Sequence, residues 1–252
     1  MLWPNRFVRT GAIAVLATTA AVALIVLALA PVAPEPRPFT SSPIERRVPV
    51  IPVVSLSIDD AASPWVVVPK QRPLAQLDYV PADLVRLDVP SPRQPELRAI
   101  AAHAVSLMFA AFTAETGLSL QAISAYRSFE SQQSVYAGWT RSLGQSAADL
   151  TSARPGFSEH QTGFAVDVDA LPATACALQP CWGDTPHAHW IAENAHRFGF
   201  VVRYPADKTP ITGYEYEPYH LRFVGVDLAT SMREAGVTTL EEQFGLPPAP
   251  GY

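Results

Sequence analysis

The feature that most constrains this chain is a run of twenty residues without a charged side chain, GAIAVLATTAAVALIVLALA at positions 11–30. At about 1.5 Å per residue, a helix of that length spans the roughly 30 Å hydrocarbon core of a bilayer. Arg6 and Arg9 precede the run, and no acidic residue occurs before Glu35. This charge distribution predicts export of everything that follows. Two interpretations stay open: an uncleaved membrane anchor, and a signal peptide cleaved after the A-x-A-like sequence Ala28-Leu29-Ala30.

The remainder of the chain divides at a change in composition. Seven prolines in residues 31–52 predict an extended spacer. We therefore expect an N-terminal segment at 1–30, a proline-rich linker at 31–64 and a folded domain at 65–252, in the cell envelope, membrane-anchored or secreted. The chain has a net charge of −5 and no basic cluster, which argues against a nucleic-acid partner. We expect a monomer.

The folded part alternates between helical and extended patterns. Helical periodicity and stop signals predict helices at 94–116, 129–143, 186–198, 227–235 and 240–244. Apolar runs predict strands at 65–70, 118–126, 163–170, 200–204 and 220–224. Helices that interleave with few strands indicate an α+β fold, with one small mixed or antiparallel sheet flanked by helices.

Cys176 and Cys181 are the two cysteines of the chain, in a C-x4-C spacing. In an oxidising compartment they can close a short loop, so we interpret them as a local disulfide. A cysteine nucleophile is the alternative, but neither residue lies in an evident strand-to-helix turn beside a histidine.

Residues suited to metal binding gather in two segments, SEHQTGFAVD and EYEPYHLRFVG. Asp167 lies in an apolar strand, where a carboxylate must be paired, hydrogen-bonded or bound to a metal. Together with His160 and His220 it could hold a zinc ion on the sheet and leave a fourth position open. The alternatives are an ion pair between Asp167 and an arginine such as Arg222, and ordinary polar roles for each histidine.

Glu217 precedes His220 by three residues, and Pro218 between them argues against a helix. We expect the pair at a turn that enters the strand, with Glu217 near enough to act as a general base. Asp169 is a candidate to orient a ligand histidine. The remaining histidines are expected at the surface or at helix caps: His103, His187, His189 and His196.

Five segments in order resemble the VanY-type D-alanyl-D-alanine carboxypeptidases. SEHQTGFAVD fits their S-x-H-x-x-G-x-A-x-D signature, SAYRSFESQ is similar to their SGYRS-x-x-x-Q segment, and EPYHLRFVG is similar to E-P-W-H-x-R-Y-V-G. PLAQLDYVPADLV and TLEEQFGL are also similar to family segments. Two departures, Tyr219 for tryptophan and Ala125 for glycine, concern the lining of the pocket. The resemblance covers about residues 65–246.

The resemblance implies one zinc ion per chain, bound by His160, Asp167 and His220, with Glu217 as the general base. It implies that Arg127 binds the terminal carboxylate of the substrate, as its planar guanidinium suits. Gln132 and Ser158 would add hydrogen bonds to the peptide. The implied fold is the small α+β zinc fold shared with lysostaphin-type enzymes and the hedgehog amino-terminal domain.

The expected function is a zinc carboxypeptidase that removes the terminal D-alanine from peptidoglycan stem peptides. The alternatives are an L,D-carboxypeptidase, an endopeptidase on peptidoglycan, and an inactive cell-wall binding module of the same fold. A serine D,D-peptidase needs S-x-x-K. It is excluded because Val67 and Pro205 stand three residues before the two lysines.

Overall fold

The computed structural model describes residues 56–252. The predicted membrane or signal segment and most of the proline-rich linker lie outside these residues. In chain order the elements are β1 (Leu84–Arg86), β2 (Glu96–Arg98), α1 (Ala99–Thr116), β3 (Ser119–Ser124), α2 (Phe129–Leu143), α3 (Gln145–Thr151), the 3-10 turn η1 (Glu159–Thr162), β4 (Ala165–Leu171), η2 (Pro180–Asp184), α4 (Pro186–Asn194), η3 (Ala195–Phe198), β5 (Phe200–Tyr204), α5 (Thr209–Thr212), β6 (Glu217–Phe223), α6 (Val226–Ala235) and α7 (Leu240–Gln243).

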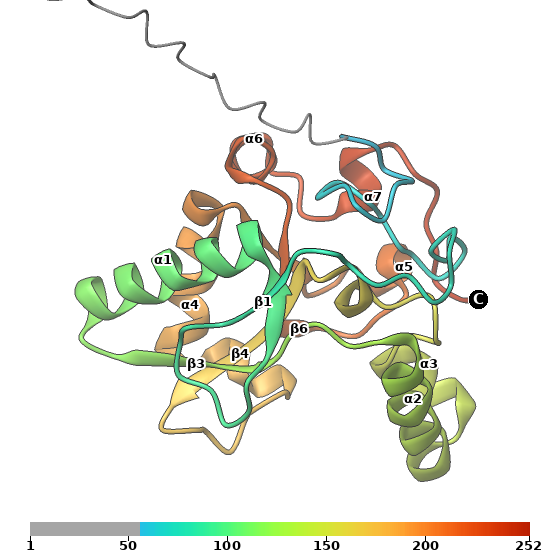
Figure 1. The fold of residues 1–252 in the computed structure, drawn as a ribbon, viewed down its shortest axis with the longest axis horizontal. Coiled ribbons are helices and arrows are strands. Elements are labelled where there is room, and N and C mark those ends of the chain that lie inside the picture. The colour runs from blue at the N-terminus through green and yellow to red at the C-terminus, as the bar shows by residue number, and fades with distance from the viewer. Residues whose placement is uncertain (1–55) are drawn as a thin grey trace, which may run out of the picture. The chain divides into compact units, whose positions relative to one another are not determined.

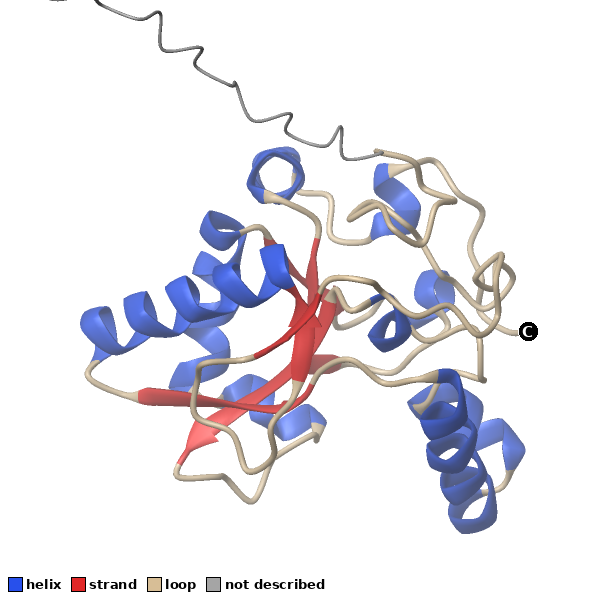
Figure 2. Ribbon diagram, in the orientation of Figure 1, coloured by secondary structure: helices blue, strands red, loops and turns tan. Residues whose placement is uncertain are grey.

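A four-stranded sheet in the order β3-β4-β6-β5 forms the centre of the fold, and β1 pairs with β2 beside it. Every pairing is antiparallel. Helices α1 and α4 lie together against the sheet, while α2 and α3 form a hairpin at the opposite end (Figures 1 and 2). The expected α+β fold with antiparallel pairing and flanking helices is confirmed, whereas the described residues form two sheets where one was expected.

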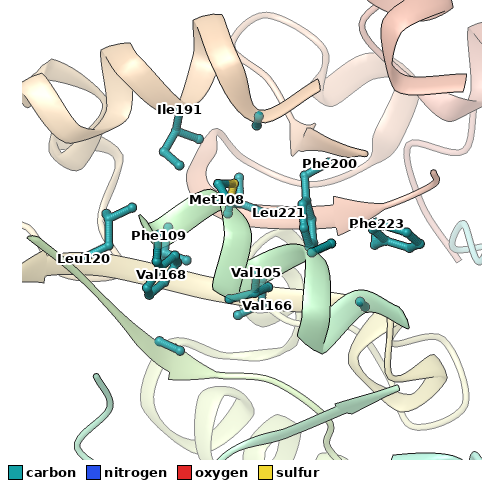
Figure 3. Close-up of a cluster of buried hydrophobic side chains, with 14 of the residues drawn as sticks. Val105, Met108, Phe109, Leu120, Val166, Val168, Ile191, Phe200, Leu221 and Phe223 are labelled. Atoms are coloured by element: carbon teal, nitrogen blue, oxygen red, sulfur yellow. The ribbon is translucent and has the colours of Figure 1, made fainter. Parts of the chain in front are cut away.

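The main hydrophobic core lies between the sheet and helices α1 and α4. Side chains of β4 and β6 that alternate along the strands face this core, among them Val166, Val168 and Leu221. Met108 of α1 and Ile191 of α4 meet them from the helical side (Figure 3). Because successive side chains of a strand alternate between faces, the residues between these positions point to the other side of the sheet.

Helix α1 is the one helix among residues 56–252 with the length and apolar content of a membrane span. Length and composition do not separate such a helix from a core helix. The packing of Val105, Met108 and Phe112 in the main core assigns α1 to the folded domain.

Several predicted elements match the structure closely. Helix α2 has the predicted bounds, and Ser128 caps it by accepting a hydrogen bond from the Ser131 backbone. Thr185 caps α4 in the same way, and Gly199 ends the following turn η3 at φ 80°. Local capping chemistry is therefore what made these boundaries predictable.

Two predictions are wrong. Helix α1 begins at Ala99 rather than residue 94, because residues 96–98 are extended and pair with β1. Residues 65–70 form no strand, although Val66, Val67 and Val68 are buried. The carbonyls of Pro64 and Val66 accept hydrogen bonds from the Arg222 guanidinium instead of a neighbouring strand.

Candidate metal centre and active site

Asp167 and His220 lie directly opposite each other on the antiparallel strands β4 and β6. Both point away from the main core, since their neighbours Val166 and Leu221 face it. The distance from His220 Nδ1 to Asp167 Oδ1 is 3.1 Å. The strand register thus brings together two residues that are distant in the sequence.

His160 reaches the same point from η1. Gly163 ends this turn at φ 71°, and a Cβ there would lie 2.8 Å from Arg98 Cγ. A glycine is therefore required where the chain turns into β4. His160 Nε2 lies 3.3 Å from Asp167 Oδ2.

One ligand atom from each of His160, Asp167 and His220 lies within 4.8 Å of the others, and all three residues are buried. The His160 Nδ1–H donates to the Ala125 carbonyl oxygen at 2.6 Å, which leaves the lone pair of Nε2 directed at the site. Asp167 Oδ1 is buried and has no hydrogen-bond partner among the described residues. Two imidazoles and a carboxylate with an unsatisfied oxygen fit a zinc ion with an open fourth position.

The electrostatics of the three residues are coupled. Burial opposes the charge of Asp167, but the two histidines outweigh it and hold the pKa of that carboxyl well below its usual range. Burial also lowers the pKa of His160. Burial also opposes a charge on His220, but the neighbouring carboxylates of Asp167, Glu159 and Glu217 outweigh it and raise the pKa of His220 to about 9. Because the nitrogen that binds a metal must be unprotonated, the metal affinity of this site would depend on pH.

Glu217 belongs to β6 itself, so the expectation of a turn before the strand is wrong. Residues 217 and 220 would normally face opposite sides of a strand. The pairing of β5 with β6 is irregular between the pairs Val202–Leu221 and Tyr204–Glu217, where β6 has more residues than β5. This bulge turns the Glu217 side chain toward the face of the sheet that carries His220. Glu217 Oε2 then lies 3.7 Å from His220 Nδ1.

Burial is the main cause that raises the pKa of Glu217, to about 8, and the charge of Asp167 adds to it. The nearby cations His220 and Arg127 oppose this rise. A carboxyl that changes protonation near neutral pH beside a metal-binding cluster is suited to proton transfer.

Arg127 lines the same cleft. Its Nη1 donates to Gln132 Oε1 at 2.8 Å and its Nη2 to Ser124 Oγ at 3.0 Å. Within residues 56–252 no carboxylate forms an ion pair with it, so N–H donors remain for an anionic ligand. Burial is the main cause that lowers the pKa of Arg127, and guanidinium stays charged despite such a shift.

Gln132 is completely buried, and its hydrogen bonds are all internal. Besides accepting from Arg127, its amide nitrogen donates to Ser152 Oγ and to the Ala153 carbonyl. Gln132 therefore holds Arg127 in place, and no donor remains for a peptide as the resemblance implied. Ser158 lines the cleft near His160 and is buried.

The cleft over these residues has a volume of about 470 Å³. One wall is α2, where Val135, Trp139 and Leu143 follow at four-residue intervals and line the cleft. The other includes residues 178–180, which lie inside the loop closed by the Cys176–Cys181 disulfide. We call this loop, residues 176–181, the disulfide strap.

Other sequence candidates lie elsewhere. Asp169 accepts hydrogen bonds from the Thr174 backbone and hydroxyl, so it stabilises a loop and orients no ligand histidine. The predicted alternative partner of Asp167, Arg222, pairs with Glu159 instead. In the described part of the chain, no metal-type cluster contains the histidines at 103, 187, 189 or 196.

Sequence reasoning missed two sets of residues. The apolar positions of α2 could have been found, because their spacing marks one face of an otherwise polar helix. Glu159, between Ser158 and His160, gave no signal, since an acidic residue in a predicted loop is ordinarily solvated. In the structure it is buried, and Arg203 and Arg222 outweigh that burial and hold its pKa well below the usual range.

Two imidazoles and a carboxylate at the floor of an open cleft, with a further carboxyl alongside, are typical of mononuclear metallohydrolases. The profile of the family described as VanY, D-alanyl-D-alanine carboxypeptidase, matches residues 94–226. The chain belongs to this family, and the resemblance seen in the sequence is thereby confirmed.

Known relatives agree with this assignment. The Bacillus subtilis (strain 168) protein YodJ is 38% identical over 172 residues, which cover 66% of this chain and 62% of YodJ. The chain thus spans less than two thirds of that relative.

The structure of the LD-carboxypeptidase LdcB is similar at a TM-score of 0.66 and 37% identity, over 73% of this chain and 86% of LdcB. A second similar structure is that of a mutant of the vancomycin-resistance D,D-pentapeptidase VanY, from a VanB-type cassette, in complex with Zn(II). Its TM-score is 0.58 at 32% sequence identity, over 71% of this chain and 97% of the VanY chain.

Proposed function

We propose that this protein is a zinc carboxypeptidase that removes the terminal D-alanine from peptidoglycan stem peptides outside the cytoplasm. The observation that carries the proposal is the convergence of His160, Asp167 and His220, within 4.8 Å, at the floor of a cleft that also contains Glu217 and Arg127. The family and the zinc complex of a relative support the choice of metal and substrate.

The residues divide the reaction between them. When bound by His160, Asp167 and His220, zinc supplies Lewis acidity to polarise the scissile carbonyl and acidify a water molecule. Glu217 takes the proton of the attacking water and later gives it to the departing amine, which leaves as D-alanine. Arg127 binds the free carboxylate of the terminal residue and so selects a carboxypeptidase substrate over an internal bond.

A second candidate is an L,D-carboxypeptidase on tetrapeptide stems. The similarity to LdcB, named an LD-carboxypeptidase, favours it specifically. Both candidates use the same metal ligands and the same base, so they differ only in which stem is accepted.

Mass spectrometry of muropeptides treated with the purified protein tests the proposal. We expect pentapeptide stems to lose one alanine, and the loss to stop with a chelator and return with zinc. Glu217→Gln is the matched control, because it removes the base and leaves all three ligands. Cleavage of tetrapeptide stems alone would favour the L,D-activity. Turnover of metal-free protein, or full turnover by the variant, would contradict the mechanism.

A further inference from the structure

Four charged side chains form a buried cluster beneath the metal-binding residues. Glu159, Arg203, Arg222 and Glu241 are each no more than 1% exposed. Burying ionic groups costs free energy that their mutual attraction only partly returns, so stability alone is a weak reason for such a cluster. One member of the cluster, Glu159, lies beside a residue of the metal-binding site, His220.

Glu159 uses only one of its carboxylate oxygens within the cluster. Oε1 accepts a hydrogen bond from Arg203 Nε at 2.8 Å and lies 3.2 Å from Arg222 Nη1. Oε2 is buried and has no hydrogen-bond partner in the described structure. It faces His220 Nε2, at 3.8 Å, which is likewise buried and unpartnered there.

The two ring nitrogens of His220 therefore have different surroundings. Nδ1 lies 3.1 Å from Asp167 Oδ1 in the metal-binding cluster, while Nε2 points into the buried charges. The Tyr204 ring packs against the imidazole at 5.0 Å between centroids. A small approach of Glu159 Oε2 to Nε2–H would satisfy both unpartnered atoms.

The carboxylate of Glu159 is itself held from two distant parts of the chain. Arg203 is bound by both oxygens of Glu241 from α7, at 2.9 and 2.7 Å. Arg222 donates to the carbonyls of Pro64 and Val66 in the segment before β1, at 2.8 and 2.9 Å. The cluster thus fixes a negative charge at one point behind His220.

We propose that Glu159 is a positioning residue for His220: it accepts the Nε2–H hydrogen bond and so directs Nδ1 at the zinc ion. Metal-binding histidines commonly donate their second N–H to a carboxylate or carbonyl, which fixes the tautomer and ring orientation. His160 does the same with the neutral Ala125 carbonyl. The inference rests on the proposed function in one respect, that His220 binds zinc.

Glu159→Gln and Glu241→Gln form a matched pair, because each removes one negative charge from the same guanidinium and only the first touches His220. Zinc affinity is measured by chelator competition, and the ligand geometry by the visible spectrum of the cobalt-substituted protein. We expect Glu159→Gln to bind zinc about 10- to 100-fold more weakly, with an altered cobalt spectrum. We expect Glu241→Gln to resemble the native protein in both measurements.

Equal effects of the two variants on zinc affinity, or no effect of Glu159→Gln, would overturn the inference. Should Glu159→Gln fail to fold, nitrogen NMR of the zinc-loaded native protein decides. The inference requires zinc at Nδ1 of His220 and a proton at Nε2 that is protected from exchange. Zinc at Nε2, or a rapidly exchanging proton, would contradict it. A native protein that binds no zinc would instead refute the proposed function.

Discussion

Arg127 carries a positive charge into the cleft and is held by Gln132 and Ser124 rather than by an acidic residue. We expect Arg127→Lys to lower kcat/KM for peptides with a free terminal carboxylate by about tenfold or more. A hydrogen bond to a charged group contributes about 1.5–3 kcal/mol, and the ammonium group of lysine cannot reproduce the planar pair of donors. Steady-state kinetics measure the change.

Arg141→Lys on the exposed side of α2 is the control, since it makes the same chemical change away from the ligand-binding atoms. If both variants retained native kcat/KM, Arg127 would have no part in carboxylate binding.

At the scale of single residues, the sequence was most informative where a side chain contradicted its surroundings. Asp167 between two core valines could be recognised because an isolated buried carboxylate is costly. The internal role of Gln132 could not be recognised, because it depends on Ser152 and Ala153 from another part of the chain. The redirection of Glu217 depends on an irregular pairing with β5, which no local pattern encodes.

The disulfide strap, residues 176–181, is an element whose function can be tested. It carries Leu178 and Pro180 to the lining of the cleft. We expect replacement of both cysteines by serine to raise KM about two- to tenfold at unchanged kcat, because ordering a released side chain costs about 0.5–1.5 kcal/mol. Kinetics with a stem pentapeptide measure this change, with zinc content as the control. An unchanged KM would show that the strap does not contribute to binding.

Asp149 of α3 pairs with Arg154 in the segment after this helix and binds Tyr136 of α2, and its charge makes the stability of this region depend on pH. Asp149 binds the Arg154 guanidinium with both oxygens and accepts from the Tyr136 hydroxyl. Burial opposes the charge of Asp149, but these partners outweigh it and lower its pKa. A lowered pKa in the folded state gives stability above the unfolded value, about 3.9, that is lost as the pH falls through the folded value.

We therefore expect Asp149→Asn to be less stable than the native protein near pH 6, and the difference to shrink as the pH falls below about 4. Denaturant unfolding at several pH values measures it, with Glu130→Gln on exposed α2 as the control. A constant difference between pH 6 and 3 would argue against the ion pair as its source.

At the scale of elements, local chemistry decided which predictions succeeded. Helices with a side-chain cap and a terminal glycine, such as α2, were predictable from the sequence alone. Residues 65–70 have the composition of a strand, yet Arg222, far along the chain, donates hydrogen bonds to the carbonyl of Val66 and to that of Pro64 just before the segment. Tertiary contacts of this kind override propensity and are not visible in a local window.

For the whole molecule, zinc binding should act as a cross-link of the central sheet, because it joins β4 to β6. A ligand that binds only the folded state stabilises it by about 2.7 kcal/mol at a free concentration of 100 times its dissociation constant. For a domain of this size each kcal/mol raises Tm by about 2–4 °C. We expect the chelator-treated protein to melt roughly 5–10 °C lower than the zinc-loaded protein.

Calorimetry with and without zinc measures this shift. His160→Ala is the control, since its Tm should no longer respond to the chelator. An equal response in the variant and the native protein would place the stabilising metal elsewhere.

The pairing of Asp167 with His220 determines when the metal-binding site can form during synthesis and folding of the chain. Since these two residues come from strands separated by several intervening elements, no partly synthesised chain that ends before β6 contains the complete ligand set. Under the proposed function, a chain that ends before β6 is expected to have no hydrolytic activity until that strand is made and paired with β4. Long-range pairing of this kind forms slowly compared with local helices, so the ligand set is expected to assemble late in folding.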